Sequence, residues 1–397
     1  MSFWSIEPRD PLVVRDGRPN IRNGESASLP FPYPSTVAGM VRTRFGTGKD
    51  GAFDRSIDLA HLREVTLRGP LLVHLGTSSI YAPHPRDCVI VAEPGDRKSI
   101  RALQPLELPA GAVTDDEIGA ASLIGFSGDD AHPKKPSHPP TFWPWGVFER
   151  WLCSPEPRLD AGDFLVGALE ALPIERRVHV QVGEQGTSED GMLFQIGGLR
   201  LQPGAWATKS GEQPPVNRPA AAMALGVDVD ASGFPDKHRS LSPGIGPSGG
   251  ERRLAYWSEA TGIKLPLAPP NAVLDFLRRP GDSARVRVIL LTPGIFNEGW
   301  KPGSGEAQLL AARHGISVEL VGACVPRSET ISGWDFEHQQ PKKTRRMVSS
   351  GSVYWLDLHG PPEARVKWAT EIMMSNVSDA PQDRNNGFGL AAVGVGS

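Results

Sequence analysis

The segment PSGGERR, residues 247–253, combines residue types that suit phosphate oxygens. Gly249 and Gly250 have no Cβ to shield their amides, and the guanidinium groups of Arg252 and Arg253 can donate paired hydrogen bonds to a phosphate. The spacing therefore predicts a phosphate contact. The alternative is an ordinary surface loop in which the glutamate of the segment pairs with an arginine.

A second segment, KKTRR, is a short basic cluster inside a long loop. Its four cations could contact an anionic partner, although clusters of this kind are commonly only solvated. The candidate residues are Lys342, Lys343, Arg345 and Arg346.

A helix start provides a third candidate anion site. Alternate prolines in LPFPYPST keep the chain extended up to the helix, which Ser35 or Thr36 can cap. A helical wheel places Val37, Met40, Val41 and Phe45 on a core-facing side, and Gly46 ends the helix. Free amides at a helix start favour anions, whereas the alternative is a capped surface helix with a solvated arginine. The residues opposite the apolar side are Ser35, Gly39 and Arg42.

Two further segments leave two interpretations open. The terminal GFGLAAVGVG could let a phosphate approach Gly387 and Gly389, or it could be a strained turn. In TPGIFNEGWKP, Trp300 could stack on a base beside Lys301, or it could pack against its own domain.

Signatures of catalysis are missing from the sequence. It contains no GxSxG, no HExxH, no HxE with a following CxxC and no GxxxxGK[ST]. Cys88, Cys153 and Cys324 are too far apart in sequence for a CxxC metal site or a disulfide framework. His179, on the strand face opposite Val178, is the best candidate for a general base, but a hydrogen-bonded structural histidine is the simpler interpretation. We therefore predict no catalytic residue, no metal and no cofactor.

The elements that must position these residues follow from hydrophobic periodicity. Strands are predicted at the N-terminus, where Trp4 and Ile6 share a face, and at 65–75 and 88–91. Residues 177–182 and 192–201 form a predicted hairpin, and 202–250 is rich in glycine and proline.

The last third has a clear order of elements. Strands are predicted at 284–292, 317–325, 352–358 and 390–395, with helices at 306–314 and 363–372. The order strand-helix-strand-strand-helix-strand is that of the split βαβ, or ferredoxin-like, fold.

Bulk composition limits the class of protein. A chain of 397 residues is longer than the chains that usually fold around one hydrophobic core, so two domains are expected. The formal net charge of −3 argues against an extended basic surface, so any nucleic acid would bind at local patches. No apolar run is long enough for a membrane helix and no signal peptide is visible, so a cytoplasmic location without a membrane partner is expected.

Several segments, taken in order, resemble one RAMP-type subunit of the type III-B CRISPR (Cmr) effector complex. They are EPRDPLVVRDGRP, SLPFPYPSTVAGMVRTRF, GTSEDGMLF, GGERR, TPGIFNEGW, ISGWDFEHQQPKKTRRMVSSGSVYWL and GFGLAAVGVG. The resemblance implies an α+β fold of two ferredoxin-like (RRM-like, RAMP) domains with long inserted loops. We place the first domain at 1–201, a loop-rich insertion or boundary at 202–283 and the second domain at 284–397.

The resemblance also implies a function. Such a subunit is not regarded as the nuclease; it grips the 5′ tag of the CRISPR RNA (crRNA) and docks the large polymerase-like subunit beside the backbone RAMP subunits, and it meets target RNA indirectly. No RNP1 motif is present, so base stacking on the sheet face is not expected. The alternatives are a metal-independent RAMP endoribonuclease that matures crRNA and a pure protein scaffold. The resemblance adds Arg15 and Arg18 to the candidate RNA contacts already named.

Overall fold

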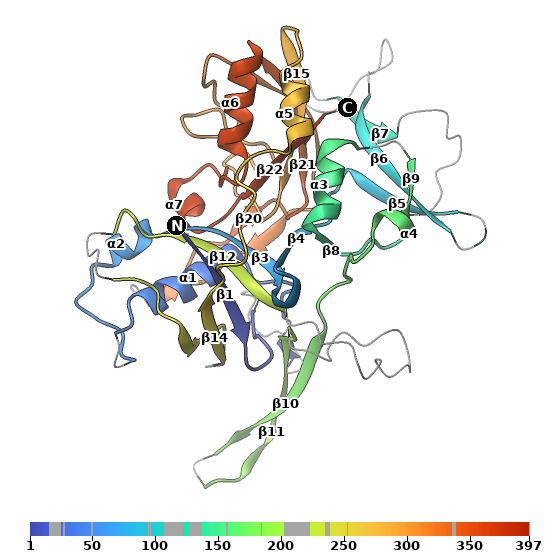
Figure 1. Ribbon diagram of the computed structural model, residues 1–397. Coiled ribbons are helices and arrows are strands. Elements are labelled where there is room, and N and C mark those ends of the chain that lie inside the picture. Colours follow the sequence, from blue (N-terminus) through green and yellow to red (C-terminus); the bar gives the residue numbers. More distant parts are fainter. Residues whose placement is uncertain are drawn as a thin grey trace. The chain divides into compact units, whose positions relative to one another are not determined.

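The chain forms two compact units, and each is assembled from three separate segments. The structure, a computed structural model, describes residues 1–15, 25–26, 28–48, 51–93, 95, 97–106, 122–126, 136–155, 158–183, 185–201, 223–234, 239–251, 253–335 and 339–396. Unit 1 contains Met1–Ser79, Ala171–Ile263 and Thr330–Arg346, and unit 2 contains Ile80–Glu170, Lys264–Glu329 and Met347–Ser397. Figure 1 colours the chain along its sequence and labels the elements of both units.

Unit 1 contains an antiparallel sheet with the ferredoxin-like strand order. Its strands are β1 (Ser2–Pro8), β3 (Thr66–His74), β12 (Met223–Asp230) and β14 (Leu254–Glu259), with β13 (Gly244–Pro247) beside β14. In space the order is β14-β1-β12-β3, so the fourth strand lies beside the first and the third lies between the first and the second. This is the order that the split βαβ arrangement produces.

Helix α1 (Pro34–Phe45) occupies the first connection of this sheet, and α2 (Leu59–Glu64) follows it. The predicted apolar side is buried, and Gly46 is the C-cap, as expected. The capping prediction is wrong, because Tyr33 is the N-cap and has no side-chain cap bond. Pro34 is the first helical residue; its fixed φ and missing N–H suit that position without a hydroxyl cap.

The predicted hairpin of unit 1 is present and longer than expected. Strand β10 (Ile174–Val182) pairs with β11 (Ser188–Leu199), which pairs in parallel with β2 (Glu25–Ser26). Figure 1 shows β10 and β11 as a long two-stranded arm. One face of the arm is apolar and open, since Val178, Val182 and Leu193 are 59%, 60% and 65% exposed.

Unit 2 repeats the ferredoxin-like strand order. Its central sheet consists of β15 (Ser283–Leu290), β16 (Ser317–Cys324), β21 (Val353–His359) and β22 (Ala391–Val395), ordered β16-β21-β15-β22, and all pairs are antiparallel. Helices α5 (Asn271–Leu277), α6 (Pro362–Ile372) and α3 (Trp145–Cys153) pack with β22 (Figure 1). The core between them includes the fully buried side chains of Tyr354 and Trp368. The predicted α+β fold with ferredoxin-like sheets is therefore confirmed.

The predicted helix at 306–314 is wrong, because this stretch consists of turns and short loops. Ala307 and His314 have φ values of +61° and +55°, which a right-handed helix does not allow. The side chain of Gln308 accepts a hydrogen bond from the Gly305 amide at 2.6 Å, so side-chain bonding replaces a helical turn.

The remaining elements are short. Those of unit 2 are β4 (Ser79–Pro83), β5 (Cys88–Ala92), β6 (Lys98–Leu106), β7 (Leu123–Phe126), β8 (Phe142–Pro144), β9 (Arg158–Asp160), α4 (Ala161–Phe164) and α7 (Pro381–Asn385), with β4 beginning at the last residue of unit 1. A 3-10 turn, η1 (Leu75–Thr77), follows β3. In the segment 329–347, β17 (Glu329–Ile331) pairs with β20 (Arg345–Met347), and β18 (Trp334–Asp335) pairs with β19 (Gln340–Pro341).

The compact units do not follow the segments 1–201, 202–283 and 284–397. The stretch assigned to a loop-rich boundary contains β12, which is a central strand of the unit 1 sheet. Nearly all of β12 is buried, so it lacks the alternation that marks a strand open to water on one face. Long-range strand pairing therefore joins segments that local sequence patterns separate.

None of the helices in the described part of the chain is long and apolar enough to cross a membrane.

A buried histidine of unit 2 makes stability depend on pH. His84 is 6% exposed and lies edge to face with Trp143, with ring centroids 5.4 Å apart. Burial, followed by the nearby charge of Arg86, lowers its pKa from 6.5 to about 3. The unfolded chain therefore binds the proton more readily, and the contribution of neutral His84 is lost as pH falls from about 6.5 toward 3.

We expect the free energy of unfolding of the wild type to fall by up to about 1.4 kcal/mol per pH unit below pH 6.5 from this group alone. Urea titrations monitored by circular dichroism at pH 7, 6 and 5 (about two units in all) measure this dependence. In His84→Gln the free energy of unfolding should depend less steeply on pH, because unfolding no longer takes up the proton that His84 binds. An equal slope in both proteins would contradict the assignment.

Candidate nucleic-acid interface

Helix α1 fixes the loop that leads into β14. The guanidinium of Arg44 donates to the carbonyls of Ser242 (2.9 Å), Pro243 (3.1 Å) and Ile245 (2.9 Å). Hydrogen bonds from a charged donor are about twice as strong as neutral ones. The segment 242–245, at the start of β13, is thus held against α1 by one side chain that the sequence analysis did not single out.

The predicted glycine pair lies in a tight turn between β13 and β14. Gly250 donates its amide to the Val13 carbonyl at 2.8 Å, and Ser248 donates to the Arg253 carbonyl at 2.8 Å. Gly249 has φ +68°, and a Cβ there would lie 2.6 Å from the Val13 carbonyl oxygen. Both observations require glycine at 249, so the pair lets the turn approach the chain's own backbone at Val13. The Gly250 amide is therefore not free for a phosphate.

Two predicted arginines lie at this turn. Arg15 forms an ion pair with Glu251, and their side chains are 46% and 37% exposed. Arg253 is half-buried, and its Nε is buried without a hydrogen-bond partner among the described residues. We call Arg15, Glu251, Arg253 and the two glycines the turn patch. The structure thus brings together residues from two predicted segments, whereas Arg18 and Arg252 lie outside the described residues.

The side chain of Arg42 has a structural role. Its Nη2 donates to the carbonyls of Arg63 (3.3 Å) and Val65 (3.0 Å), where α2 ends. Burial, followed by the Arg63 charge, lowers the pKa of Arg42 to about 10. Its guanidinium is therefore bonded to the chain's own backbone, and the anion site proposed at the start of α1 gains no support from it.

The other residues predicted on this side of α1 differ in exposure. Ser35 and Thr36 are half-buried, and Gly39 is exposed with open space where a Cβ would lie. Only Gly39 is thus freely open to solvent.

The basic cluster is the most accessible of the predicted sites. The backbone of Lys342 donates to the Gly333 carbonyl at 2.8 Å, and β20 follows within three residues. All four cations of this cluster are exposed, and we call them the basic segment: Lys342, Lys343, Arg345 and Arg346.

The predicted glycines near the C-terminus are buried. The Gly387 amide donates to the Arg384 carbonyl at 2.9 Å and the Gly389 amide to the Pro293 carbonyl at 2.7 Å. The Gly387 carbonyl accepts from the Thr292 hydroxyl at 2.7 Å. Both glycines have positive φ values and are buried in unit 2. The structure therefore gives no support to an RNA contact at either glycine.

Trp300 and Lys301 are also bonded within unit 2. The Trp300 carbonyl accepts from the Tyr354 hydroxyl at 2.7 Å, and the indole packs against the core. The Lys301 ammonium lies 4.0 Å from the Glu298 carboxylate. The packing interpretation of Trp300 therefore describes the structure better than the stacking one.

His179 lies on β10 and stacks on Phe194, with ring centroids 5.6 Å apart and an interplanar angle of 17°. It occupies the face opposite Val178, as the alternation predicts. Among the described residues, no group of three or more His, Cys, Asp or Glu side chains could hold a metal ion.

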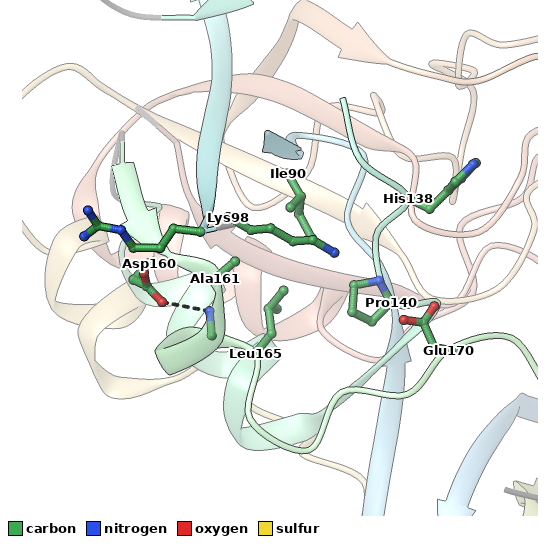
Figure 2. A pocket seen from close by; sticks show the side chains of 10 residues that line it. Ile90, Lys98, His138, Pro140, Asp160, Ala161, Leu165 and Glu170 are labelled. Atoms are coloured by element: carbon green, nitrogen blue, oxygen red, sulfur yellow. Dashed lines mark hydrogen bonds between the residues drawn. The ribbon is translucent and has the colours of Figure 1, made fainter. Parts of the chain in front are cut away.

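A pocket of about 400 Å³ in unit 2 was missed by the sequence analysis (Figure 2). Ile90 and Leu165 are among its apolar lining residues, and its charged or titratable lining residues are Arg97, Lys98, His138, Asp160 and Glu170. Asp160 accepts from the Gly162 amide at 2.8 Å and caps α4, as the dashed line in Figure 2 marks. In sequence these residues fall in three separate stretches, 90–98, 138–140 and 160–170, so only the fold brings the stretches together.

The two ferredoxin-like sheets define the class of the protein as an α+β chain with a repeated ferredoxin-like plan. The model of the CRISPR-associated protein (Cas_Cmr3) family matches residues 4–396. The chain therefore belongs to this family, and the predicted identification as a RAMP-like subunit of the type III-B (Cmr) CRISPR effector is confirmed.

Other comparisons add little detail. A chain in a cryo-EM structure of the type III-B Cmr-β complex bound to cognate target RNA is 14% identical, with 89% of this chain and 86% of that chain covered and a TM-score of 0.44. A chain in the crystal structure of a Csm3–Csm4 subcomplex of the type III-A interference complex is 9% identical, with coverages of 89% and 92% and a TM-score of 0.31. These scores are too low to support an argument about this chain. A comparison with curated protein sequences returns no match.

Proposed function

We propose that this chain is a non-catalytic subunit that binds the 5′ tag of crRNA and docks the large polymerase-like subunit beside the backbone RAMP subunits. The observation that carries the proposal is the exposure of all four cations of the basic segment in a chain whose net charge is −3. In a family of type III effector subunits, a local cationic surface on an otherwise slightly acidic chain fits one short RNA segment.

The turn patch is the second cationic element of unit 1. Arg15 is exposed, and its ion pair with Glu251 is of the solvent-accessible kind that contributes little to stability. A phosphate can therefore compete with Glu251 for this guanidinium at small cost. The turn is already held by backbone hydrogen bonds, which lowers the entropy lost when RNA binds.

A protein partner is supported by the arm formed by β10 and β11. Its open face carries Val178, Val180, Val182 and Leu193, all exposed. Contiguous apolar side chains on a surface mark sites of protein contact, and a phosphate backbone gains nothing from them. We assign this face to docking within the effector complex.

The experiment that tests tag binding changes the turn patch. In Arg15→Ala/Arg253→Ala we expect roughly 10-fold weaker binding of tag-containing crRNA near 0.15 M salt. The slope of log K against log salt should also be smaller by about 1.4, because each of the two lost phosphate contacts to a single strand contributes about 0.7. Filter binding to the full chain at several salt concentrations, repeated with the assembled complex, measures both quantities.

The matched control removes two exposed cations of unit 2 in Lys264→Ala/Arg327→Ala and should leave the affinity nearly unchanged. A crRNA without its tag should bind the wild type and the turn-patch variant alike. Equal losses in the control and the turn-patch variant, or no loss in either, would contradict tag binding at the turn patch.

A further inference from the structure

Unit 2 contains a second pocket, of about 390 Å³, in which positive charge predominates. It lies where α5 leads into β15 and also borders β21 and α6. Its lining residues are Phe276, Arg279, Pro280, Ser283, Ala284, Arg285, Asp357 and Arg365. Three guanidinium groups and one carboxylate give the pocket an excess of two positive charges. None of these groups belongs to the turn patch or to the basic segment.

Arg365 is the buried charge of this pocket. It is 1% exposed, and its Nη2 donates to the Arg279 carbonyl at 2.8 Å. Its Nε is buried without a hydrogen-bond partner among the described residues, and no carboxylate of that part of the chain pairs with it. A buried charge without a counter-charge is costly, so an anion in the pocket would be held strongly.

The one carboxylate of the pocket is already neutralised. Asp357 accepts from Nε and Nη2 of Arg285, both at 2.8 Å, which is a bidentate pair. The nearby Glu319 carboxylate lies 3.1 Å from the His359 ring nitrogen. Neither carboxylate therefore supplies the missing counter-charge for Arg365.

The mouth of the pocket offers a surface for a flat ring. The Arg279 guanidinium lies over the Phe276 ring, 5.2 Å from its centroid. Arg279 is exposed and Phe276 is half-buried, so both groups can be reached from solvent. Aromatic rings and guanidinium planes are the groups on which proteins stack nucleobases.

We propose that this pocket binds one nucleotide, with its phosphate against Arg365 and Arg279 and its base against the Phe276–Arg279 pair. The ligand is either a free nucleotide or one residue of single-stranded RNA, since both present the same phosphate and ring. The proposal does not depend on the 5′-tag role, because none of its residues belongs to unit 1.

Isothermal titration of the full chain at low salt tests the proposal, with 5′-AMP, adenosine, inorganic phosphate and a four-nucleotide RNA as probes. We expect AMP to bind at least about 10-fold more tightly than adenosine, because its phosphate accepts charge-assisted hydrogen bonds that adenosine cannot form. Tighter binding of the RNA than of AMP would identify the strand as the source of the ligand, and the reverse would identify a free nucleotide.

Variants at the edge of the pocket avoid the folding risk of changing Arg365. Arg279→Ala should weaken AMP binding roughly 10-fold, whereas Asp357→Asn should strengthen it several-fold, because it removes a negative charge and frees Arg285. The control Arg278→Ala removes the adjacent exposed arginine, which pairs with Asp275 at 2.8 Å outside the pocket, and should change nothing. Equal effects of Arg278→Ala and Arg279→Ala, weaker binding in Asp357→Asn, or equal binding of AMP and N-acetylglutamate would overturn the proposal.

Discussion

Replacing Asp87 by alanine is expected to lower the free energy of unfolding by about 3–5 kcal/mol, the largest effect on stability of any substitution considered. Asp87 and Arg287 form an ion pair with side chains 0% and 1% exposed. Arg287 is left as an uncompensated buried charge when its partner is removed.

The geometry of this pair explains the size of the expected effect. The Trp151 indole N–H donates to Asp87 Oδ1 at 2.9 Å, while Arg287 donates to the carbonyls of Trp151 (2.6 Å) and Val395 (2.7 Å). One network of hydrogen bonds thus connects α3, β15 and β22 with Asp87, the residue directly before β5. Removal of the Asp87 carboxylate leaves two buried donors, the Trp151 indole N–H and Arg287 Nη1, without their acceptor, and each costs about 1–3 kcal/mol.

Urea unfolding followed by circular dichroism at pH 7 measures this loss. The matched control is Asp275→Ala, which breaks the exposed Arg278–Asp275 pair and should change stability by no more than about 0.5 kcal/mol. The double variant Asp87→Ala/Arg287→Met should recover part of the loss, because no uncompensated charge remains. An Asp87→Ala protein as stable as the control would show that water reaches the pair.

Replacing all four cations of the basic segment by alanine should weaken crRNA binding roughly 100-fold near 0.15 M salt. Each phosphate contact to a single strand contributes about 0.7 to the dependence of log K on log salt, so four lost contacts reduce the slope by about 3. Because all four side chains are exposed, the substitutions remove charge without opening a cavity. The thermal midpoint should therefore remain within a few degrees of the wild type, since changes at exposed positions are usually within about 0.5 kcal/mol.

Filter binding between low and high salt separates this result from a general charge effect. The control removes the same number of exposed cations from unit 2: Lys264, Arg278, Arg327 and Lys367. A control that loses as much affinity as the basic-segment variant would show that only net charge matters. Loss of affinity without a change of slope would indicate that the segment does not contact phosphates.

Local elements were the part of the fold most accessible to sequence analysis. Helix α1 and the hairpin of β10 and β11 follow from hydrophobic periodicity, whereas the unit 2 strands β15, β21 and β22 are short apolar runs that are buried along most of their length. Strand β12 did not follow, because Gly226, Asp228 and Asp230 interrupt its apolar run, and the turns of 306–314 did not follow, because side-chain bonding by Gln308 overrides local preference.

The candidate sites show the same division. The composition of residues 342–346 was enough to predict a basic segment, and its four cationic side chains are exposed in the structure. The meeting of Arg15 with the turn at 249–253, and of Arg365 with the end of α5, depends on contacts between residues far apart in the chain.

By itself, the sequence determined the family, the four strands and the last helix of the unit 2 ferredoxin-like sheet, and the place of the cationic clusters along the chain, since each depends on the local order of residues. Only the tertiary structure decided which of the glycines and cations are available for a ligand. Gly387, Gly389 and Arg42 are bonded to the chain's own backbone, whereas the basic segment is open to solvent. The physical reason is that a backbone amide or guanidinium has a limited set of hydrogen bonds to give, and distant parts of the chain compete for them only once it has folded.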